Sequence, residues 1–416
     1  MSLSRRDLLA RLGLGMTFLP GLAMAPRSVV GSLLFEPDGV LVPAKTIPAN
    51  PFVRNGKVLV AMVHGRDPVA LLQAGLELIG GIGLLGVEGK RVLIKPNIVN
   101  DRPPPSTTNP AVVAAVVRAV RDAGAMDVQV SDSSGMIRFP TSENLLATGV
   151  RQAAESAGAR VLALEDQPWV RVEPAGAKSL PRYYVSKPVY DADVFINLPV
   201  VKTHRFAHYS CSLKNLVGIT HPRYRPSLSF LSGDWHERIA ELNLAVHPHL
   251  TIADGTTVMI AGGPTSGTAA QADLLLLSGD RVALDAVGVA LIRSFGAWPK
   301  LMEQSVWEQR QIRRAMELKL GVSGPDEVEL VTRSVSGSHP DFNKRVDAIR
   351  RDLGKAWRMA GLFDLLGLLR VRGVLGAPDP DVGPSFAGRV LAPVGGPQGL
   401  RGVSPGSTAD DSLHAV

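Results

Sequence analysis

Short runs of aliphatic and β-branched residues alternate with longer helical patterns from Lys57 onward, and this alternation most constrains the fold. Strands separated by helices are typical of βαβ units, whose strands pair in parallel and whose helices cover both faces of the sheet. We therefore predict an α/β fold with a largely parallel central sheet. The predicted strands are residues 57–63, 91–95, 127–131, 160–164, 193–199, 250–254 and 272–278, with 325–331 as one further strand.

Capping residues mark where the predicted helices begin. Asp67 and Asn109 each precede a proline, an arrangement typical of an N-cap followed by the first helical residue. Asp280 is expected to cap the next long helix. Asp234 and Glu237 have the spacing of a capping box, which predicts one more helix start.

Changes in composition predict four segments. We expect a signal segment at 1–30, an α/β domain at 55–332, an amphipathic helix at 354–372 and a tail at 377–416. Proline, glycine and serine dominate the tail, so we expect it to be disordered. The amphipathic helix could pack on the same domain, lie on a membrane surface or dock on a partner, and packing on the domain is the preferred prediction.

The N-terminus resembles a twin-arginine export signal. Arg5 and Arg6 precede an apolar stretch at 12–25 that is too short to span a bilayer comfortably. A basic N-terminus with a buried helix is the alternative. The sequence Ala23-Met24-Ala25 has the form of a cleavage site, but the proline that follows would hinder cleavage. We expect a periplasmic or exported protein that uses the twin-arginine translocase, anchored in the membrane if the signal is retained.

Charge and cysteine content exclude several functional classes. The chain has 45 basic and 38 acidic residues, a net charge of +7, and no motif typical of nucleic-acid binding, so we expect no nucleic-acid partner. Cys211 is the single cysteine. An internal disulfide is therefore excluded, and an internal iron–sulfur cluster is not expected.

Polar residues follow or end several of the predicted strands. Because the carboxyl ends of parallel strands meet at one edge of a sheet, and ligands of open α/β sheets bind there, these residues predict a binding site. Three lysines are suited to holding a carboxylate or a phosphate. The predicted ligand-binding residues are Lys95, Asn97, Asp132, Lys202, Lys214 and Asn215.

His204 and Asp254 are the predicted catalytic residues. His204 would transfer a proton, and Asp254 would act as a base or a metal ligand, with a purely structural Asx-turn as its alternative. The spacings of His204 with His208, and of His247 with His249, would suit a metal ion, yet no metalloenzyme motif accompanies them. The identity of any metal or cofactor stays open.

Several motifs together resemble one family. "VLIKPN", "VSDSSG", "DADVFINLPVVKTH", "SLKNLVGI" and "TIADGTTVMIAGGPTSGT" occur in the order expected of the family known as domain of unknown function 362, over about residues 55–320. The resemblance implies that the polar positions named above, from Lys95 to Asp254, are recurring positions of the family. Some members carry an added ferredoxin-like module, which this chain lacks. The resemblance implies no defined reaction.

These observations predict an exported enzyme, with redox chemistry and a redox partner protein as options. It would bind an anionic small molecule or cofactor at the carboxyl edge of the sheet. The alternative is a periplasmic binding or cofactor-carrier protein that uses the same pocket without turnover. A further alternative is a membrane-associated partner of a respiratory complex, with residues 354–372 as its contact.

Overall fold

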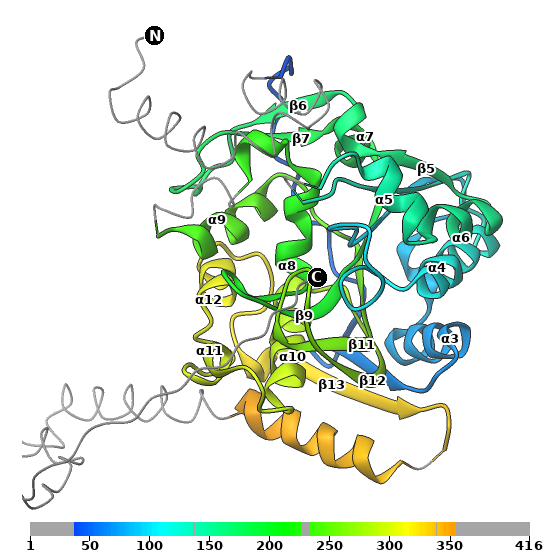
Figure 1. The fold of residues 1–416 in the computed structure, drawn as a ribbon, viewed down its shortest axis with the longest axis vertical. Coiled ribbons are helices and arrows are strands. Elements are labelled where there is room, and N and C mark those ends of the chain that lie inside the picture. The colour runs from blue at the N-terminus through cyan, green and yellow to red at the C-terminus, as the bar shows by residue number, and fades with distance from the viewer. Residues whose placement is uncertain (1–36, 136–137, 226–232, 338, 355–416) are drawn as a thin grey trace, which may run out of the picture. The chain divides into compact units, whose positions relative to one another are not determined.

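The computed structural model describes residues 37–135, 138–225, 233–337 and 339–354 (Figure 1). The predicted signal segment, the tail and all but the first residue of the helix predicted at 354–372 lie outside these residues. The described residues belong to a single compact unit. Within them, no helix is both long and apolar enough to cross a bilayer.

The described residues form one eleven-stranded mixed sheet with most strands in parallel. Its main path runs β1-β2-β12-β11-β8-β3-β4-β5, with β13 beside β2 and the β9–β10 hairpin beside β11. The predicted α/β fold with a largely parallel sheet is confirmed. The strands are β1 (Val53–Arg54), β2 (Lys57–His64), β3 (Arg91–Pro96), β4 (Asp127–Asp132), β5 (Arg160–Ala163), β8 (Val194–Leu198), β9 (Val200–His204), β10 (His208–Ser210), β11 (Leu250–Gly262), β12 (Gly267–Ser278) and β13 (Val328–Ser334).

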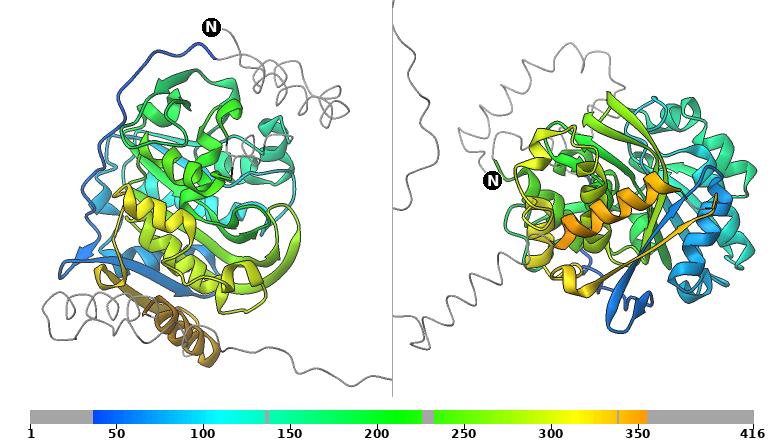
Figure 2. Two further views of the ribbon diagram at one scale, coloured as in Figure 1. Left: turned by 90° about the vertical axis from the view of Figure 1, so that its left-hand side faces the viewer. Right: turned by 90° about the horizontal axis from the view of Figure 1, so that it is seen from below.

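Helices cover both faces of this sheet (Figures 1 and 2). A separate two-stranded sheet is formed by β6 (Trp169–Val172) and β7 (Tyr183–Ser186). The helices are α3 (Pro68–Ile79), α4 (Pro110–Asp122), α5 (Thr141–Ala147), α6 (Val150–Ser156), α7 (Lys187–Asp191), α8 (Ser212–Asn215), α9 (Trp235–Glu241), α10 (Arg281–Arg293), α11 (Pro299–Met302) and α12 (Arg310–Glu317).

Side-chain alternation along β2 explains why helices are needed on both faces. Leu59, Ala61 and Val63 join one core cluster with residues of α3 and α4, whereas Val60 and Met62 join a second cluster with residues of α10. Successive side chains of a strand point to opposite faces, so a strand that is apolar throughout must be covered on both sides. The continuous apolar runs of the sequence therefore give a sheet buried between two layers.

Three predicted N-caps are confirmed, and α9 begins after Asp234 as predicted but without the side-chain hydrogen bond of a capping box. Asp67, Asn109 and Asp280 each accept hydrogen bonds from backbone N–H groups at the start of α3, α4 and α10. The side chain of Asp234 caps nothing at α9 and instead accepts from Arg238 Nε at 2.9 Å. A charged hydrogen bond of this kind is stronger than one to a neutral backbone N–H.

The packed domain extends beyond the predicted limits of 55 and 332. Phe52 is fully buried, and a helix begins at residue 340 and continues to residue 354. That helix was not predicted, although its apolar residues recur at helical spacing. Its buried side chains join the same core cluster as α10 and are Phe342, Val346, Ile349 and Leu353.

A long hairpin of β11 and β12 corrects the position of Asp254. The strand predicted at 250–254 continues to Gly262, so Asp254 lies inside β11 and not at its end. The glycine-rich stretch after β11 is the turn of this hairpin, since Gly263 N–H donates to Ser266 O at 2.8 Å.

Candidate functional site

A cavity of about 550 Å³ opens where β3 and β4 end, and residues of β9 also line it. The structure brings most of the predicted residues together here, although their segments lie far apart in the chain. Predicted residues that line the cavity are Lys95, Asn97, Asp132, Lys202, His204, Lys214 and Asn215. Asp254 does not line it.

Lys95 and Asp132 form a buried ion pair in this cavity. Lys95 Nζ lies 2.5 Å from Asp132 Oδ1 and also donates to Pro96 O at 3.1 Å. The other oxygen, Asp132 Oδ2, accepts from Ile98 N–H at 2.6 Å. Burial lowers the pKa of Lys95, and the charge of Asp132 opposes this shift. The pair is electrically balanced, so it cannot by itself account for an anion site.

The backbone at Gly218 runs against this ion pair. A Cβ atom at this position would lie 2.3 Å from Asp132 Oδ1 and 2.8 Å from Lys95 Nζ. Real Cβ atoms do not approach so closely, so any side chain here would push the pair apart. The glycine in the motif "SLKNLVGI" is therefore explained by the space that the ion pair occupies.

Lys202 on β9 is buried and has no carboxylate partner among the described residues. Its Nζ donates to Ser106 O at 2.5 Å and to Asn97 Oδ1 at 3.4 Å. Burial, followed by repulsion from Lys214, lowers the pKa of Lys202 to about 7. Neutral oxygen acceptors stabilise an ammonium less than a carboxylate does, so the charge on Lys202 is poorly compensated.

Lys214 on α8 is the third lysine of the cavity wall. The structure gives its ammonium neither a hydrogen bond nor an ion pair with any described residue, and its side chain is half-buried. Burial, followed by repulsion from Arg225 and Lys95, lowers the pKa of Lys214 to about 8. An unpaired cation in a cavity wall is the feature expected of an anion site.

Arg225 is a cavity residue that the sequence reasoning did not single out. Its guanidinium donates to Ser134 O, to Ser133 Oγ at 2.6 Å and to Thr220 O at 3.1 Å, and burial lowers its pKa to about 10. Residues 198–225 contain several lysines and arginines and no acidic residue, and this run of basic residues is the sequence signal that could have found Arg225. Asp132 is the one carboxylate among the described lining residues, against the cations Lys95, Arg138, Lys202, Lys214 and Arg225.

His204 is held in one tautomer by the backbone. Its Nδ1 lies 3.2 Å from Phe206 N and 3.1 Å from Ala207 N, and because backbone N–H groups can only donate, Nδ1 must accept. The neutral ring therefore carries its proton on Nε2. Burial, followed by repulsion from Lys214 and Lys202, lowers the pKa of His204 well below its ordinary value. His204 is suited to donate a hydrogen bond from Nε2, and the proton transfer predicted for it stays a prediction.

Asp254 has a structural position. Its carboxylate accepts from Asn109 N–H at 2.8 Å, from Thr256 N–H at 3.0 Å and from Thr256 Oγ1 at 2.7 Å. These contacts fix the start of α4 against β11 and match the Asx-turn that was the alternative. Since Asp254 does not line the cavity, we omit it from the proposed site as a base or a metal ligand.

The described histidines do not form a metal site. His247 contacts Arg281 Nη2 at 2.8 Å and Lys45 O at 2.9 Å, and His249 Nδ1 accepts from Phe195 N–H at 3.1 Å. The ring of His208 packs edge-on against that of His236, with centroids 4.7 Å apart. Among the described residues no three histidine, cysteine or acidic side chains gather as metal ligands would.

Asn215 and Asp285 position the segment that carries Lys214. Asn215 Nδ2 donates to Asn197 Oδ1 at 2.8 Å and to Lys95 O at 3.3 Å, so its amide joins α8 to β8 and β3. Asp285, a fully buried residue of α10, accepts from Ser212 N–H at 2.6 Å and from Leu213 N–H at 3.3 Å. These contacts hold α8 in place. Asn215 therefore contributes mainly by positioning its neighbours.

Aromatic side chains form another part of the cavity wall. Phe206 and Trp235 both line it, with ring centroids 6.0 Å apart, and Phe206 is 60% exposed. Trp235 Nε1 is buried and has no hydrogen-bond partner among the described residues. The cavity thus combines unpaired cations with an aromatic wall, which suits an anion that also carries an apolar or planar part.

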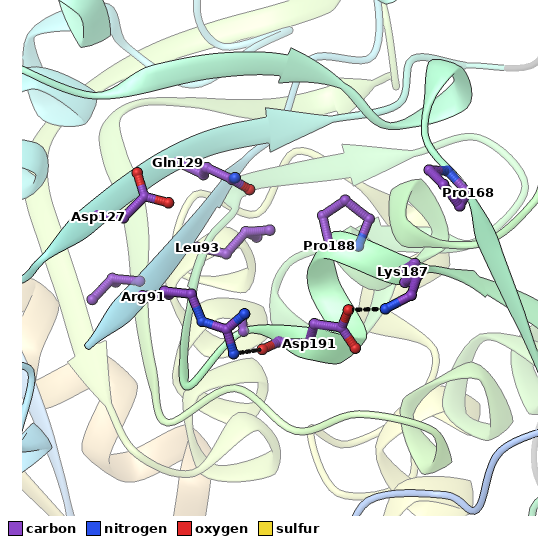
Figure 3. A pocket seen from close by; sticks show the side chains of 10 residues that line it. Arg91, Leu93, Asp127, Gln129, Pro168, Lys187, Pro188 and Asp191 are labelled. Carbon is purple, nitrogen blue, oxygen red and sulfur yellow. Dashed lines mark hydrogen bonds and ion pairs between the residues drawn. The ribbon is translucent and has the colours of Figure 1, made fainter.

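A second cavity, of about 210 Å³, lies near the amino ends of β3 and β4 (Figure 3). Figure 3 shows Arg91 and Lys187 directed toward Asp191. Arg91 Nη2 donates to Asp191 O at 2.9 Å and pairs with Asp193 at 3.0 Å, and Lys187 pairs with Asp191. Because these charges are matched within the protein, this cavity gives little reason to expect a charged ligand.

Comparison with known proteins agrees with the motifs of this site. Residues 92–290 match the family model described as "Domain of unknown function (DUF362)". The thylakoid-associated protein sll1697 of Synechocystis sp. (strain ATCC 27184 / PCC 6803 / Kazusa) is 31% identical over 230 residues, which cover 53% of this chain and 68% of that protein.

One solved structure is distantly similar. The lactate racemase apoprotein from Thermoanaerobacterium thermosaccharolyticum aligns with a TM-score of 0.38 and 11% identity, over 74% of this chain and 91% of that one. At this level the similarity says nothing about function. The family model covers the segments that supply the lysines, the ion pair and Gly218, and the Synechocystis relative is similar over most of its own length. The chain therefore belongs to the DUF362 family.

Proposed function

We propose that this protein binds an anionic small molecule or an anionic organic cofactor in the cavity at the carboxyl edge of the sheet. The observation that carries the proposal is Lys214, whose ammonium lines the cavity without a partner among the described residues. The poorly compensated Lys202 and the buried Arg225 add positive charge beside it. Phe206 and Trp235 would contact the apolar part of the ligand.

The energetics of these cations support a ligand. Burying an ammonium without a counter-ion is unfavourable, and the lowered pKa values of Lys202 and Lys214 express that cost. A bound anion would stabilise both ammonium groups and raise both pKa values again. The protein without ligand is therefore expected to be less stable than the complex, by an amount set by the affinity.

A non-catalytic carrier is the second candidate, and specific observations favour it. The one lining carboxylate, Asp132, is held in the ion pair with Lys95, and the Nδ1 lone pair of His204 accepts backbone hydrogen bonds. A general base is thus not evident among the described lining residues. Enzyme and carrier are separated by Lys202→Met, which in an enzyme lowers turnover of bound ligand and in a carrier changes affinity alone.

A redox role would come from the ligand. Cys211 is fully buried, and burial followed by repulsion from Asp285 raises the pKa of its thiol well above the ordinary value. A protonated, buried thiol is a poor nucleophile and a poor redox group. We therefore propose a redox cofactor only as one kind of anionic ligand of the cavity. A redox partner protein belongs to the proposal only together with such a cofactor.

Replacing Lys214 tests the binding proposal. Native mass spectrometry of protein purified from its own cells should show an added mass, and Lys214→Met should lower the affinity for that ligand at least about tenfold, the effect of losing one charged contact. Lys178→Met is the control, because Lys178 is exposed and lies outside the cavity. Protein that carries no ligand, and is stabilised against heat by none of phosphate, carboxylates or nucleotides, would contradict the proposal.

We also propose export through the twin-arginine translocase, supported by Arg5, Arg6 and the apolar stretch that follows them. Replacement of both arginines by lysine should leave the protein inside the cytoplasm, because this pathway depends on the arginine pair. Cell fractionation with antibody detection measures the distribution. An unchanged periplasmic fraction in the double variant would refute this route.

A further inference from the structure

Lys214 differs from the other two cavity lysines in its hydrogen bonding. Anion binding alone does not require this difference. Lys95 donates to Asp132 and Pro96 O, and Lys202 donates to Ser106 O, so the nitrogen atoms of both are engaged by protein acceptors. Lys214 has no acceptor among the described residues. Nothing described therefore holds a third proton on its nitrogen, and neighbouring cations oppose one.

The backbone that carries Lys214 is held firmly. Asp285 caps Ser212 and Leu213 at the start of α8, and Asn215 at its end is tied to Asn197 and Lys95 O. An amine on a fixed backbone segment, in the wall of a cavity and among cations, has the arrangement by which proteins make a lysine nucleophilic. Consistently, the pKa of Lys214 is lowered to about 8, so roughly a tenth of the amine is unprotonated at neutral pH.

We propose that the ε-amino group of Lys214 forms an imine with a ligand that carries both an anionic group and an aldehyde or ketone. This inference rests on the proposed function and names the class of ligand. The nitrogen lone pair forms a bond to the carbonyl carbon, the carbonyl π electrons move to oxygen, and a proton passes from nitrogen to that oxygen. The carbinolamine then loses its hydroxyl group and the remaining nitrogen proton as water. Amine and carbonyl become imine and water, with no oxidant or reductant.

The rest of the cavity suits this reaction. Arg225 and Lys202 would hold the anionic group, and the Nε2–H of His204 could donate to a ligand oxygen. Phe206 and Trp235 would limit the access of water to the imine, which water hydrolyses. The structure thus places charge for binding and an unengaged amine for bond formation in one cavity.

Reductive trapping of the full-length protein tests this inference. We use pyridoxal 5′-phosphate and glyoxylate, two anionic aldehydes of different size, each with sodium cyanoborohydride, followed by intact mass measurement and peptide mapping. The expected result is one adduct per chain on Lys214, formed well before adducts on exposed lysines such as Lys178. Lys214→Arg should abolish that adduct.

Analogues without a carbonyl separate the two proposals. Pyridoxine 5′-phosphate and glycolate keep the anionic group but cannot form an imine. Lys214→Arg should bind them within a few-fold of the original protein because it keeps the charge, and Lys214→Met should bind them weakly. If the analogues bind but neither aldehyde labels Lys214, the imine is refuted and anion binding stands. If neither the aldehydes nor the analogues bind, the inference fails together with the proposed ligand class.

Discussion

Gly218→Ala should weaken anion binding and strongly destabilise the protein. The added methyl group would lie 2.3 Å from Asp132 Oδ1 and 2.8 Å from Lys95 Nζ, so these groups must shift, and we expect the ion pair to separate. Separating a buried ion pair costs about 3–5 kcal/mol because each charge is left uncompensated. Urea unfolding should show a lower free energy of unfolding by that order, and ligand titration should show at least a tenfold loss of affinity.

Gly83→Ala is the matched control. Gly83 lies in the exposed 3₁₀ turn Ile82–Leu85, and nothing lies within 4 Å of the position that its Cβ would take. This variant should unfold within about 0.5 kcal/mol of the original protein, as exposed substitutions usually do. Equal effects of the two substitutions, or a Gly218→Ala protein with normal stability and affinity, would show that the contact with the ion pair has no energetic importance.

The sheet and the cavity could be predicted from the sequence because both depend on local signals. A run such as "RVLIKPN" contains a buried strand and the polar residues that follow it, and parallel strands bring such residues to one edge. Lys95 and Asp132 lie at the ends of β3 and β4, and Lys202 follows β8 on β9, so all three reach this edge.

Other features depend on contacts between distant segments. Asp254 follows an apolar run, yet β11 continues past it because β12 and β9 offer partners for the extension. The tautomer of His204 depends on how the chain turns at Phe206 and Ala207. Arg225 and Trp235 reach the cavity from irregular segments whose course no periodic pattern indicates. The position of Asp254, the tautomer of His204 and the two missed residues could not be predicted because tertiary structure decides them.

Because of the buried lysines, we expect the free energy of unfolding to increase with pH. The pKa of Lys202 is lowered from 10.5 to about 7 in the folded protein. Between these values the unfolded chain binds more protons than the folded one, so the free energy of unfolding increases as the pH rises from about 7 toward 10.5. Below about pH 7 the ammonium is present in both states and the folded protein bears the full cost. Lys214, with a pKa of about 8, adds to this trend.

Lys202→Met should remove most of this pH dependence. It should also change stability and ligand binding in opposite directions. Methionine fills a similar volume without a charge, and replacing a poorly compensated buried charge by an apolar side chain is often neutral or stabilising by about 1–4 kcal/mol. We expect the ligand-free variant to melt a few degrees higher than the original protein near pH 6, and the difference to shrink toward pH 9. Its affinity for the anionic ligand should fall at least about tenfold, because a cation of the cavity is lost.

Calorimetry at several pH values, with ligand titration at each, measures both effects, and Lys178→Met should change neither. If Lys202→Met increases the stability and decreases the affinity, Lys202 destabilises the folded protein and serves ligand binding. A Lys202→Met protein that melts lower at every pH would instead show that the hydrogen bonds to Ser106 O and Asn97 Oδ1 outweigh the cost of the charge. In that case Lys202 is a structural residue, and the anion site reduces to Lys214 and Arg225.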